Sequence, residues 1–171
     1  MQLVKIMEIP DELQALVKDA LENIYKRDLT LAIAEECTGG LISSLVTDFE
    51  ETLDALLFSV IVPNSEAKEE FLGIPSYIFS NFGAISLECT KAMAENLLDY
   101  DADIGIATTG ILGEGQEGKL KGTAYIAVAV KMHETFVKQM SLNPKASRFD
   151  LKIDIAKELF DLLQFAIKSS Y

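Results

Sequence analysis

Three short apolar runs, each ending in a polar turn, constrain the fold of this chain more than any other feature. The runs cover residues 29–34, 55–62 and 103–109, and the turns cover residues 36–40, 63–68 and 108–118. Short apolar runs bounded by Gly, Pro, Asn or Ser are typical of buried strands, and we expect the second run to be covered on both faces. Because helical stretches lie between the runs, the pattern predicts an α/β fold.

Helical periodicity and turn residues complete the predicted architecture. Apolar residues recur at helical spacing after Pro10, in a stretch that ends near residue 48, and over residues 66–72, 86–98 and 155–167. Ser86 is the expected N-cap of its helix. Residues 123–131 and 134–141 flank a short turn and predict a hairpin. We expect a single three-layer α/β/α domain over residues 1–171, with a mostly parallel mixed sheet that carries an antiparallel strand.

Composition narrows the classes of function. No window reaches the roughly 18 apolar residues of a membrane-spanning helix, and the N-terminus lacks a signal-peptide pattern, so we expect a soluble, cytoplasmic protein without a membrane partner. A net charge of −12 without a run of Lys or Arg argues against nucleic acid as a partner. Cys37 and Cys89 are expected as buried thiols. The single histidine, His133, falls in the hairpin turn, so we predict no metal and no cofactor.

The turn after the first apolar run is a weak candidate site when it is considered alone. Ligands of open α/β sheets bind beyond the carboxyl ends of the strands. Thr38, Gly39 and Gly40 lie there at a predicted helix N-terminus, where N–H groups attract a phosphate or carboxylate, although ordinary helix capping is the favoured interpretation. Cys37 is interpreted as a small packed residue, and Lys68 as a surface lysine of a helix.

A set of short motifs changes this interpretation. In chain order they are Glu35-x-Cys37-Thr38-Gly39-Gly40, Glu66-Ala67-Lys68, Gly83-Ala84-Ile85-Ser86, Ala92-Met93-Ala94, Thr109-Gly110-Ile111-x-Gly113 and Gly122-Thr123. Together they resemble the CinA C-terminal domain, from about residue 29 to the final helix. The resemblance implies hydrolysis of the carboxamide of nicotinamide mononucleotide to nicotinic acid mononucleotide and ammonia, in pyridine nucleotide recycling, by a serine assisted by lysine and tyrosine. We also expect a homo-oligomer.

The chain departs from the family pattern at positions that matter for this chemistry. Glu36 stands where the family has its serine nucleophile, and Pro63 stands where it has the tyrosine. Lys68 is retained. Glu114 replaces a proline of the glycine-rich loop, and Lys152 replaces an arginine. Lysine keeps the positive charge but lacks the bidentate fork that arginine offers a phosphate. The resemblance thus leaves enzymatic activity open.

Three explanations for Glu36 remain open. Glu36 could act with Lys68 in catalysis, and water activation is then favoured over direct attack, because attack would give a high-energy anhydride. Alternatively, Glu36 and Lys68 form an ion pair in a catalytically inactive nucleotide-binding or interaction domain. In the third explanation, Ser43, Ser44 or Ser65 replaces the missing nucleophile. In each case the implied ligand is nicotinamide mononucleotide or a related small nucleotide. Its implied binding residues are Thr38, Gly39, Gly40, Thr109, Gly110, Gly113 and Lys152.

Overall fold

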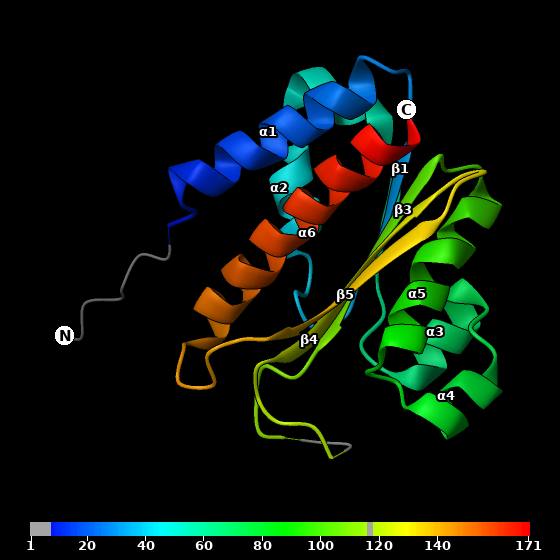
Figure 1. Ribbon diagram of the computed structural model, residues 1–171, viewed down its shortest axis with the longest axis vertical. Helices are drawn as coiled ribbons and strands as arrows, with labels where there is room; N and C mark the ends of the chain where they lie inside the picture. Colours follow the sequence, from blue (N-terminus) through cyan, green and yellow to red (C-terminus); the bar gives the residue numbers. More distant parts are fainter. Residues whose placement is uncertain (1–7, 116–117) are drawn as a thin grey trace.

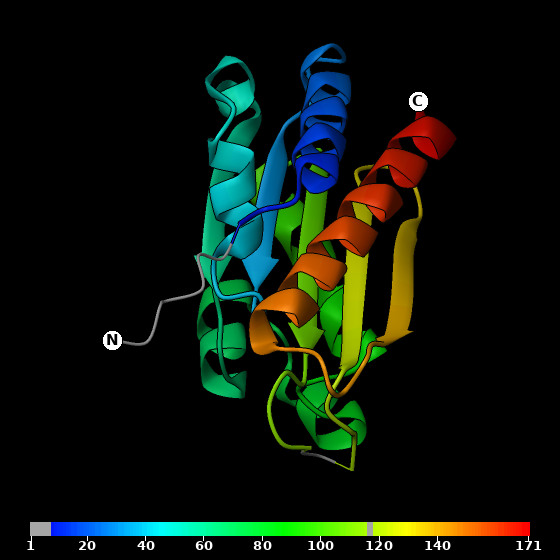
Figure 2. The same ribbon diagram turned by 90° about the vertical axis from the view of Figure 1, so that its left-hand side faces the viewer.

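Five strands form one sheet with helices on both faces in the computed structural model, which describes residues 8–115 and 118–171 (Figures 1 and 2). In chain order the elements are α1 Asp11–Tyr25, β1 Leu31–Glu35, α2 Leu41–Thr47, the 3-10 helix η1 Glu50–Ala55, β2 Leu56–Ile61, α3 Ser65–Leu72, α4 Ser76–Phe82, α5 Leu87–Asn96, the 3-10 helix η2 Leu97–Tyr100, β3 Ile104–Gly110, β4 Thr123–Val130, β5 Thr135–Ser141 and α6 Arg148–Ser170. The three-layer α/β class is confirmed.

The strand order brings the predicted turns together. The sheet runs β2-β1-β3-β4-β5, with β1 parallel to β2 and β3, and β4 antiparallel to β3 and β5. β4 is therefore the antiparallel strand of a mostly parallel sheet, and the predicted hairpin is confirmed as β4–β5. Because β1, β2 and β3 are parallel, the turns that follow them meet at one end of the sheet.

Side-chain size differs between the two faces of the sheet. The face under α1, α2 and α6 carries large aliphatic residues such as Ile33 and Ile106, whereas the face under α5 carries alanines such as Ala34 and Ala107. Gly105 has no room for a side chain, because a Cβ there would lie 2.1 Å from the backbone oxygen of Ala94 in α5. The small residues thus let α5 pack directly against the backbone of β3 (Figure 1).

Two features differ from the sequence-based expectation, and one cap is confirmed. β2 is an edge strand in which alternate residues are exposed, so the prediction of a strand covered on both faces is wrong. α4 was missed, because seven residues after Pro75 are too few to show helical periodicity. Ser86 does cap α5, where its side chain accepts a hydrogen bond from the Cys89 N–H. Cys37 and Cys89 are both buried thiols.

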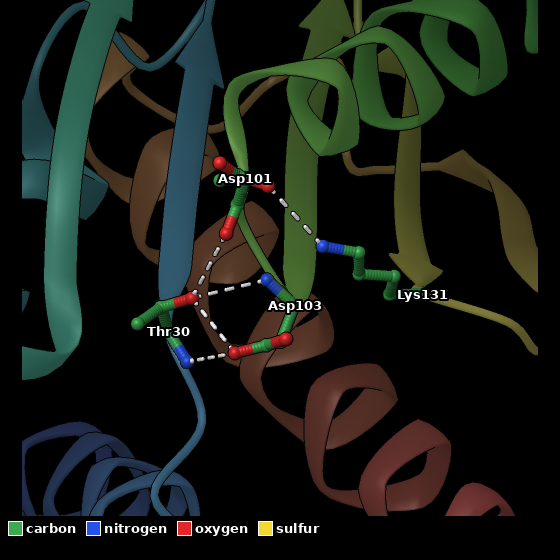
Figure 3. A network of polar contacts seen from close by, with 4 residues as sticks. All are labelled: Thr30, Asp101, Asp103 and Lys131. Carbon is green, nitrogen blue, oxygen red and sulfur yellow. Dashed lines mark hydrogen bonds and ion pairs between the residues drawn. The ribbon is translucent and has the colours of Figure 1, made fainter.

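A polar network closes the end of the sheet where β1 and β3 begin (Figure 3). The Thr30 N–H and hydroxyl donate to the Asp103 carboxylate at 2.9 and 2.8 Å, and the Asp103 N–H donates to the Thr30 hydroxyl at 3.1 Å. Lys131 and Asp101 form a longer, exposed ion pair beside it, at 3.5 Å. These contacts join the starts of β1 and β3 through groups of the chain itself.

Among the described residues, we find no helix with both the length and the apolar content needed to cross a lipid bilayer.

Candidate functional site at the carboxyl ends of the parallel strands

Glu35, the last residue of β1, caps the N-terminus of α2. Its side chain is fully buried, and its carboxylate accepts hydrogen bonds from the N–H groups of Gly40, Ile42 and Ser43 at 2.9, 3.2 and 2.8 Å. The Ser43 hydroxyl donates to the same carboxylate. A negative charge at this position also compensates the helix dipole. The anion-binding position of α2 is thus filled by the chain's own carboxylate.

This cap changes what the Thr38–Gly40 turn can offer a ligand. The Gly40 N–H is already engaged with Glu35, and the Thr38 side chain is buried, with its hydroxyl 2.9 Å from that of Thr108. Within the described residues, the N–H groups of Thr38 and Gly39 have no protein acceptor. Those two donors, and not the predicted three, are available at this turn.

Lys152 lies beside the same turn. Gly39 has φ +61°, and a Cβ built on it would lie 3.3 Å from the Lys152 ammonium nitrogen. The fold therefore brings a cation of α6 to the turn after β1, although the two are far apart in sequence. An N–H pair next to a lysine is an arrangement suited to an anion.

Glu36 occupies the junction between the ends of β1 and β3. Its backbone N–H donates to the Thr108 oxygen at 3.1 Å, and its carboxylate accepts from the Gly110 N–H at 2.9 Å. Unlike Glu35, its side chain is only half-buried. The Glu36 carboxylate is thus fixed in place while part of it remains accessible.

Two cavities meet at Glu36. The smaller has a volume of about 190 Å³ and is lined by Glu36, Pro63, Asn64, Ser65, Lys68, Ala84 and Ile85. The larger has a volume of about 490 Å³ and is lined by Glu36, Cys37, Pro63, Gly110, Ile111, Leu112, Gly113, Glu114 and Arg148. Glu36 and Pro63 belong to both walls. Of the positions where the chain departs from the family pattern, Glu36 and Pro63 therefore lie at the junction of the two cavities.

Lys68 is fully buried, so its interpretation as a surface lysine, made from the helix pattern alone, is wrong. The Asn64 side chain caps α3 by accepting from the Ala67 N–H at 2.8 Å, which sets the start of the helix one turn before Lys68. The Lys68 ammonium donates to the Ala84 oxygen at 2.6 Å. Buried lysines are rare, and this one lies in the wall of the small cavity.

The glycine-rich loop contributes unequally to the site. Gly110 and Gly113 line the larger cavity, and a Cβ on Gly113 would lie 3.7 Å from a guanidinium nitrogen of Arg148. Thr109 is fully buried, with its hydroxyl 2.7 Å from that of Thr90 in α5, so it supports the loop from behind. Residues 116–117 of the predicted loop lie outside the described residues.

Cys37 lines the larger cavity but is poorly suited to be a nucleophile. Burial raises the pKa of its thiol well above the ordinary value, and the charge of Glu36 raises it further. A thiol in this state carries almost no thiolate near neutral pH. The prediction of a small packed residue agrees with this environment.

The comparison with known proteins settles the family. The family model of the CinA C-terminal domain matches residues 13–166. The chain belongs to this family. It is 34% identical over 148 residues to a competence-damage inducible protein of Thermoanaerobacter sp. (strain X514), an alignment that covers 82% of this chain and 36% of that protein. The chain thus spans about a third of the length of the curated relatives it matches.

Solved structures of CinA proteins share the fold. The competence/damage inducible protein CihA from Agrobacterium tumefaciens superposes with a TM-score of 0.87 at 22% identity, over 95% of this chain and 99% of that one. A competence or damage-inducible protein from Enterobacter asburiae gives 0.85 at 27% identity, over 91% and 98%. The fold of this chain is therefore shared with these two proteins over nearly their whole length.

The three serines considered as replacement nucleophiles in this CinA domain lie in different places. Ser43 donates to Glu35 and contacts Ser59, so its hydroxyl belongs to the cap of α2. Ser44 is exposed on the same helix. Ser65 lines the small cavity together with Lys68. Of the three, Ser65 is the one that the fold places beside the retained lysine.

Sequence reasoning assigned no role to two residues of this CinA site. Glu35 was noted only as part of a motif, because it ends β1 and does not occupy the N-cap position of α2, which is Gly40. Arg148 begins α6 and lines the larger cavity, a position that only the tertiary fold reveals. His133 is exposed in the hairpin turn as predicted, and the described residues hold no group of three or more His, Cys, Asp or Glu that could bind a metal ion.

Proposed function

We propose that this CinA domain binds nicotinamide mononucleotide, or a closely related nucleotide, in the larger cavity and hydrolyses its carboxamide in the smaller one. The observation that carries the proposal is the position of Glu36, whose side chain lines both cavities at their junction. A ligand that spans the junction would place its nucleotide part against the glycine-rich loop and its amide between Glu36 and Lys68.

In this proposal Glu36 acts as the general base. Its carboxylate takes a proton from a water molecule whose oxygen attacks the amide carbon, and the positive charge of Lys68 stabilises the negative charge that develops on the amide oxygen. The carbon–nitrogen bond then breaks, and the proton held by Glu36 passes to the leaving ammonia. Water and amide are thereby converted to a carboxylic acid and ammonia without a covalent intermediate, and the acid then gives its proton to ammonia, which leaves a carboxylate and ammonium.

Two cations support the binding of a phosphate. Arg148 and Lys152 are four residues apart on α6, so they lie on one face of that helix. Arg148 lines the larger cavity, and the Lys152 ammonium lies beside the available N–H groups of Thr38 and Gly39. This pair offers charge and hydrogen-bond donors to a phosphate even though the family arginine is replaced.

A second candidate is a CinA domain that binds the nucleotide without hydrolysing it. It is favoured by the backbone contacts of the two central groups, because the Glu36 carboxylate accepts from the Gly110 N–H and the Lys68 ammonium donates to the Ala84 oxygen. Groups that are held by the backbone are less free to exchange protons with a substrate. Binding through Arg148 and Lys152 would be kept.

The deciding experiment measures ammonia release from nicotinamide mononucleotide by the purified protein, with calorimetric binding of the same nucleotide alongside. Glu36→Gln and Lys68→Ala should abolish turnover, whereas Lys131→Ala, a surface lysine at the other end of the sheet, should not. Loss of turnover in Ser65→Ala would instead assign the nucleophile to Ser65. Binding without turnover supports the second candidate, and the absence of both contradicts each of them.

A further inference from the structure

β2 and β5 are the two edges of the sheet (Figure 2), and their side chains protect them differently against pairing. β5 carries Lys138 near its centre, where it forms an ion pair with Glu158 of α6. A charge on an edge strand discourages the addition of another strand. β2, with the sequence Leu-Leu-Phe-Ser-Val-Ile, contains no charged residue and no proline. One edge of this sheet is therefore blocked and the other is open.

Apolar side chains are exposed on both sides of the open edge. On the α2 side, Leu57 is 44% and Ile61 is 50% exposed. On the α3 side, Phe71 and Tyr100 are 59% and 53% exposed, and the Tyr100 ring packs against Phe58 of β2 with centroids 5.3 Å apart. The Tyr100 hydroxyl donates to the Phe71 oxygen at 3.1 Å, which holds this pair together. An uncharged strand with apolar flanks is suited to be covered by another strand.

We propose that two copies of this chain pair through β2, antiparallel across a two-fold axis, so that their sheets join into one. Two molecules that each carry a net charge of −12 repel one another, and a two-fold contact places like residues close together, so the contact needs an uncharged strand. β2 meets this requirement and offers its outward N–H and C=O groups as the bonding partners.

The side chains select one register. With Ser59 opposite Ser59 of the partner subunit, Leu57 lies opposite Ile61 of the partner subunit, and Phe58 lies opposite Val60 of the partner subunit. Each exposed apolar side chain of the strand then meets an apolar side chain on the same face, which is the stabilising arrangement for cross-strand pairs. A shift by one residue would bring residues of opposite faces together.

The pairing would also hold the wall of the functional site. Pro63 follows β2 directly and lines both cavities, and the Ile61 side chain lies 3.3 Å from the Cβ position of Gly40 in the turn after β1. The proposal itself rests on the edge strand and does not depend on the proposed function.

The first test is the mass of the full chain in solution by sedimentation equilibrium. Wild-type protein should sediment as a dimer, and Leu57→Lys combined with Ile61→Lys should raise the dimer dissociation constant on the order of 100-fold, because the introduced lysines of the two copies then lie directly opposite each other. Gln139→Lys, an exposed position on β5, is the matched control and should remain a dimer. A wild-type monomer, or a dimer that persists unchanged in the Leu57→Lys, Ile61→Lys variant, would overturn the proposal.

The second test uses the register. In Ser59→Cys the two introduced thiols would face each other across the axis, at the separation of directly opposite residues, which a disulfide can span. Mild oxidation should give a covalent dimer on a non-reducing gel, whereas Gln139→Cys should not, and the native thiols Cys37 and Cys89 are buried. Failure of Ser59→Cys to cross-link in a protein that sediments as a dimer would show that the contact lies elsewhere.

Discussion

The two ends of the sheet carry polar groups of the same kind in opposite situations. Where β1 and β3 begin, the Asp103 carboxylate and the Thr30 hydroxyl bond to each other (Figure 3). Where β1 ends, Glu35 is satisfied in the same way, but Glu36, its neighbour in sequence, lines two cavities. A carboxylate whose partners all belong to the chain stabilises the fold, whereas one that borders a cavity can meet a ligand.

The largest expected effect comes from removing the Glu35 carboxylate, whose hydrogen-bond partners all belong to the chain. Glu35→Ala should lower the free energy of unfolding by about 3 kcal/mol, because three N–H groups of α2 lose a buried acceptor. Urea denaturation measures this change, and Glu22→Ala, which removes an exposed acid of α1, is the control. An equal response in both variants would contradict the role of Glu35 as a cap.

The next effect concerns Glu36, the carboxylate that borders the two cavities. Glu36→Ser combined with Pro63→Tyr restores the side chains of the family pattern at the junction of the cavities, so amidase activity on nicotinamide mononucleotide should appear or rise about 100-fold. Ammonia release under saturating substrate measures the gain. Glu36→Ser alone is the control, because it lacks the tyrosine. No gain in the double variant would mean that the surrounding pocket no longer places the substrate.

Substitutions at the end of the sheet where β1 and β3 begin should change stability but not nucleotide binding. Asp103→Ala removes the acceptor of two hydrogen bonds from Thr30 and should cost about 2 kcal/mol of unfolding free energy, with nucleotide binding unchanged. Lys131→Ala, which breaks only the exposed pair with Asp101, should leave stability unchanged within error. A change of nucleotide affinity in Asp103→Ala would contradict the separation of the two ends.

Removing a lysine from α6 should weaken nucleotide binding only near the N-terminus of the helix, where Lys152 lies. Lys152→Ala should weaken nicotinamide mononucleotide binding about tenfold in calorimetry at low salt, because it removes one charge–phosphate contact near Gly39. Lys168→Ala removes the same charge from the exposed far end of the same helix and is the matched control. Equal affinities in the two variants would contradict a phosphate position at Lys152.

The sequence predicts the helices and strands of this fold better than it predicts which of them lie side by side. Strand, turn and helix patterns and the Ser86 cap depend on nearby residues, and they were identified correctly except for the short helix α4. The edge position of β2 is set by strand order, which local periodicity does not contain, and a half-exposed edge strand has the same apolar composition as a covered one.

The candidate site shows the same limit. Lys68 is polar on a short amphipathic helix, so its burial depends on the cavity beyond it and only the family motif pointed to a role. Lys152 reaches Gly39, and Arg148 reaches Gly113, through the packing of α6 across the sheet. Such contacts between distant segments have no local signal.

The smallest expected effect concerns Cys37. This residue lines the larger cavity, but its thiol is buried, as the Glu35 carboxylate is. Because burial, and then Glu36, raise the pKa of its thiol in the folded state, its contribution to stability is complete below the pKa of the unfolded thiol, about 8.5, and is lost as the pH rises above it. The free energy of unfolding should fall by about 0.8 kcal/mol more between pH 7 and pH 9 in wild type than in Cys37→Ala. An equal pH dependence of the unfolding free energy in wild type and Cys37→Ala, or rapid alkylation of Cys37 at pH 8, would contradict a buried thiol. Cys37 would then belong, like Glu36, to the groups that a ligand can reach.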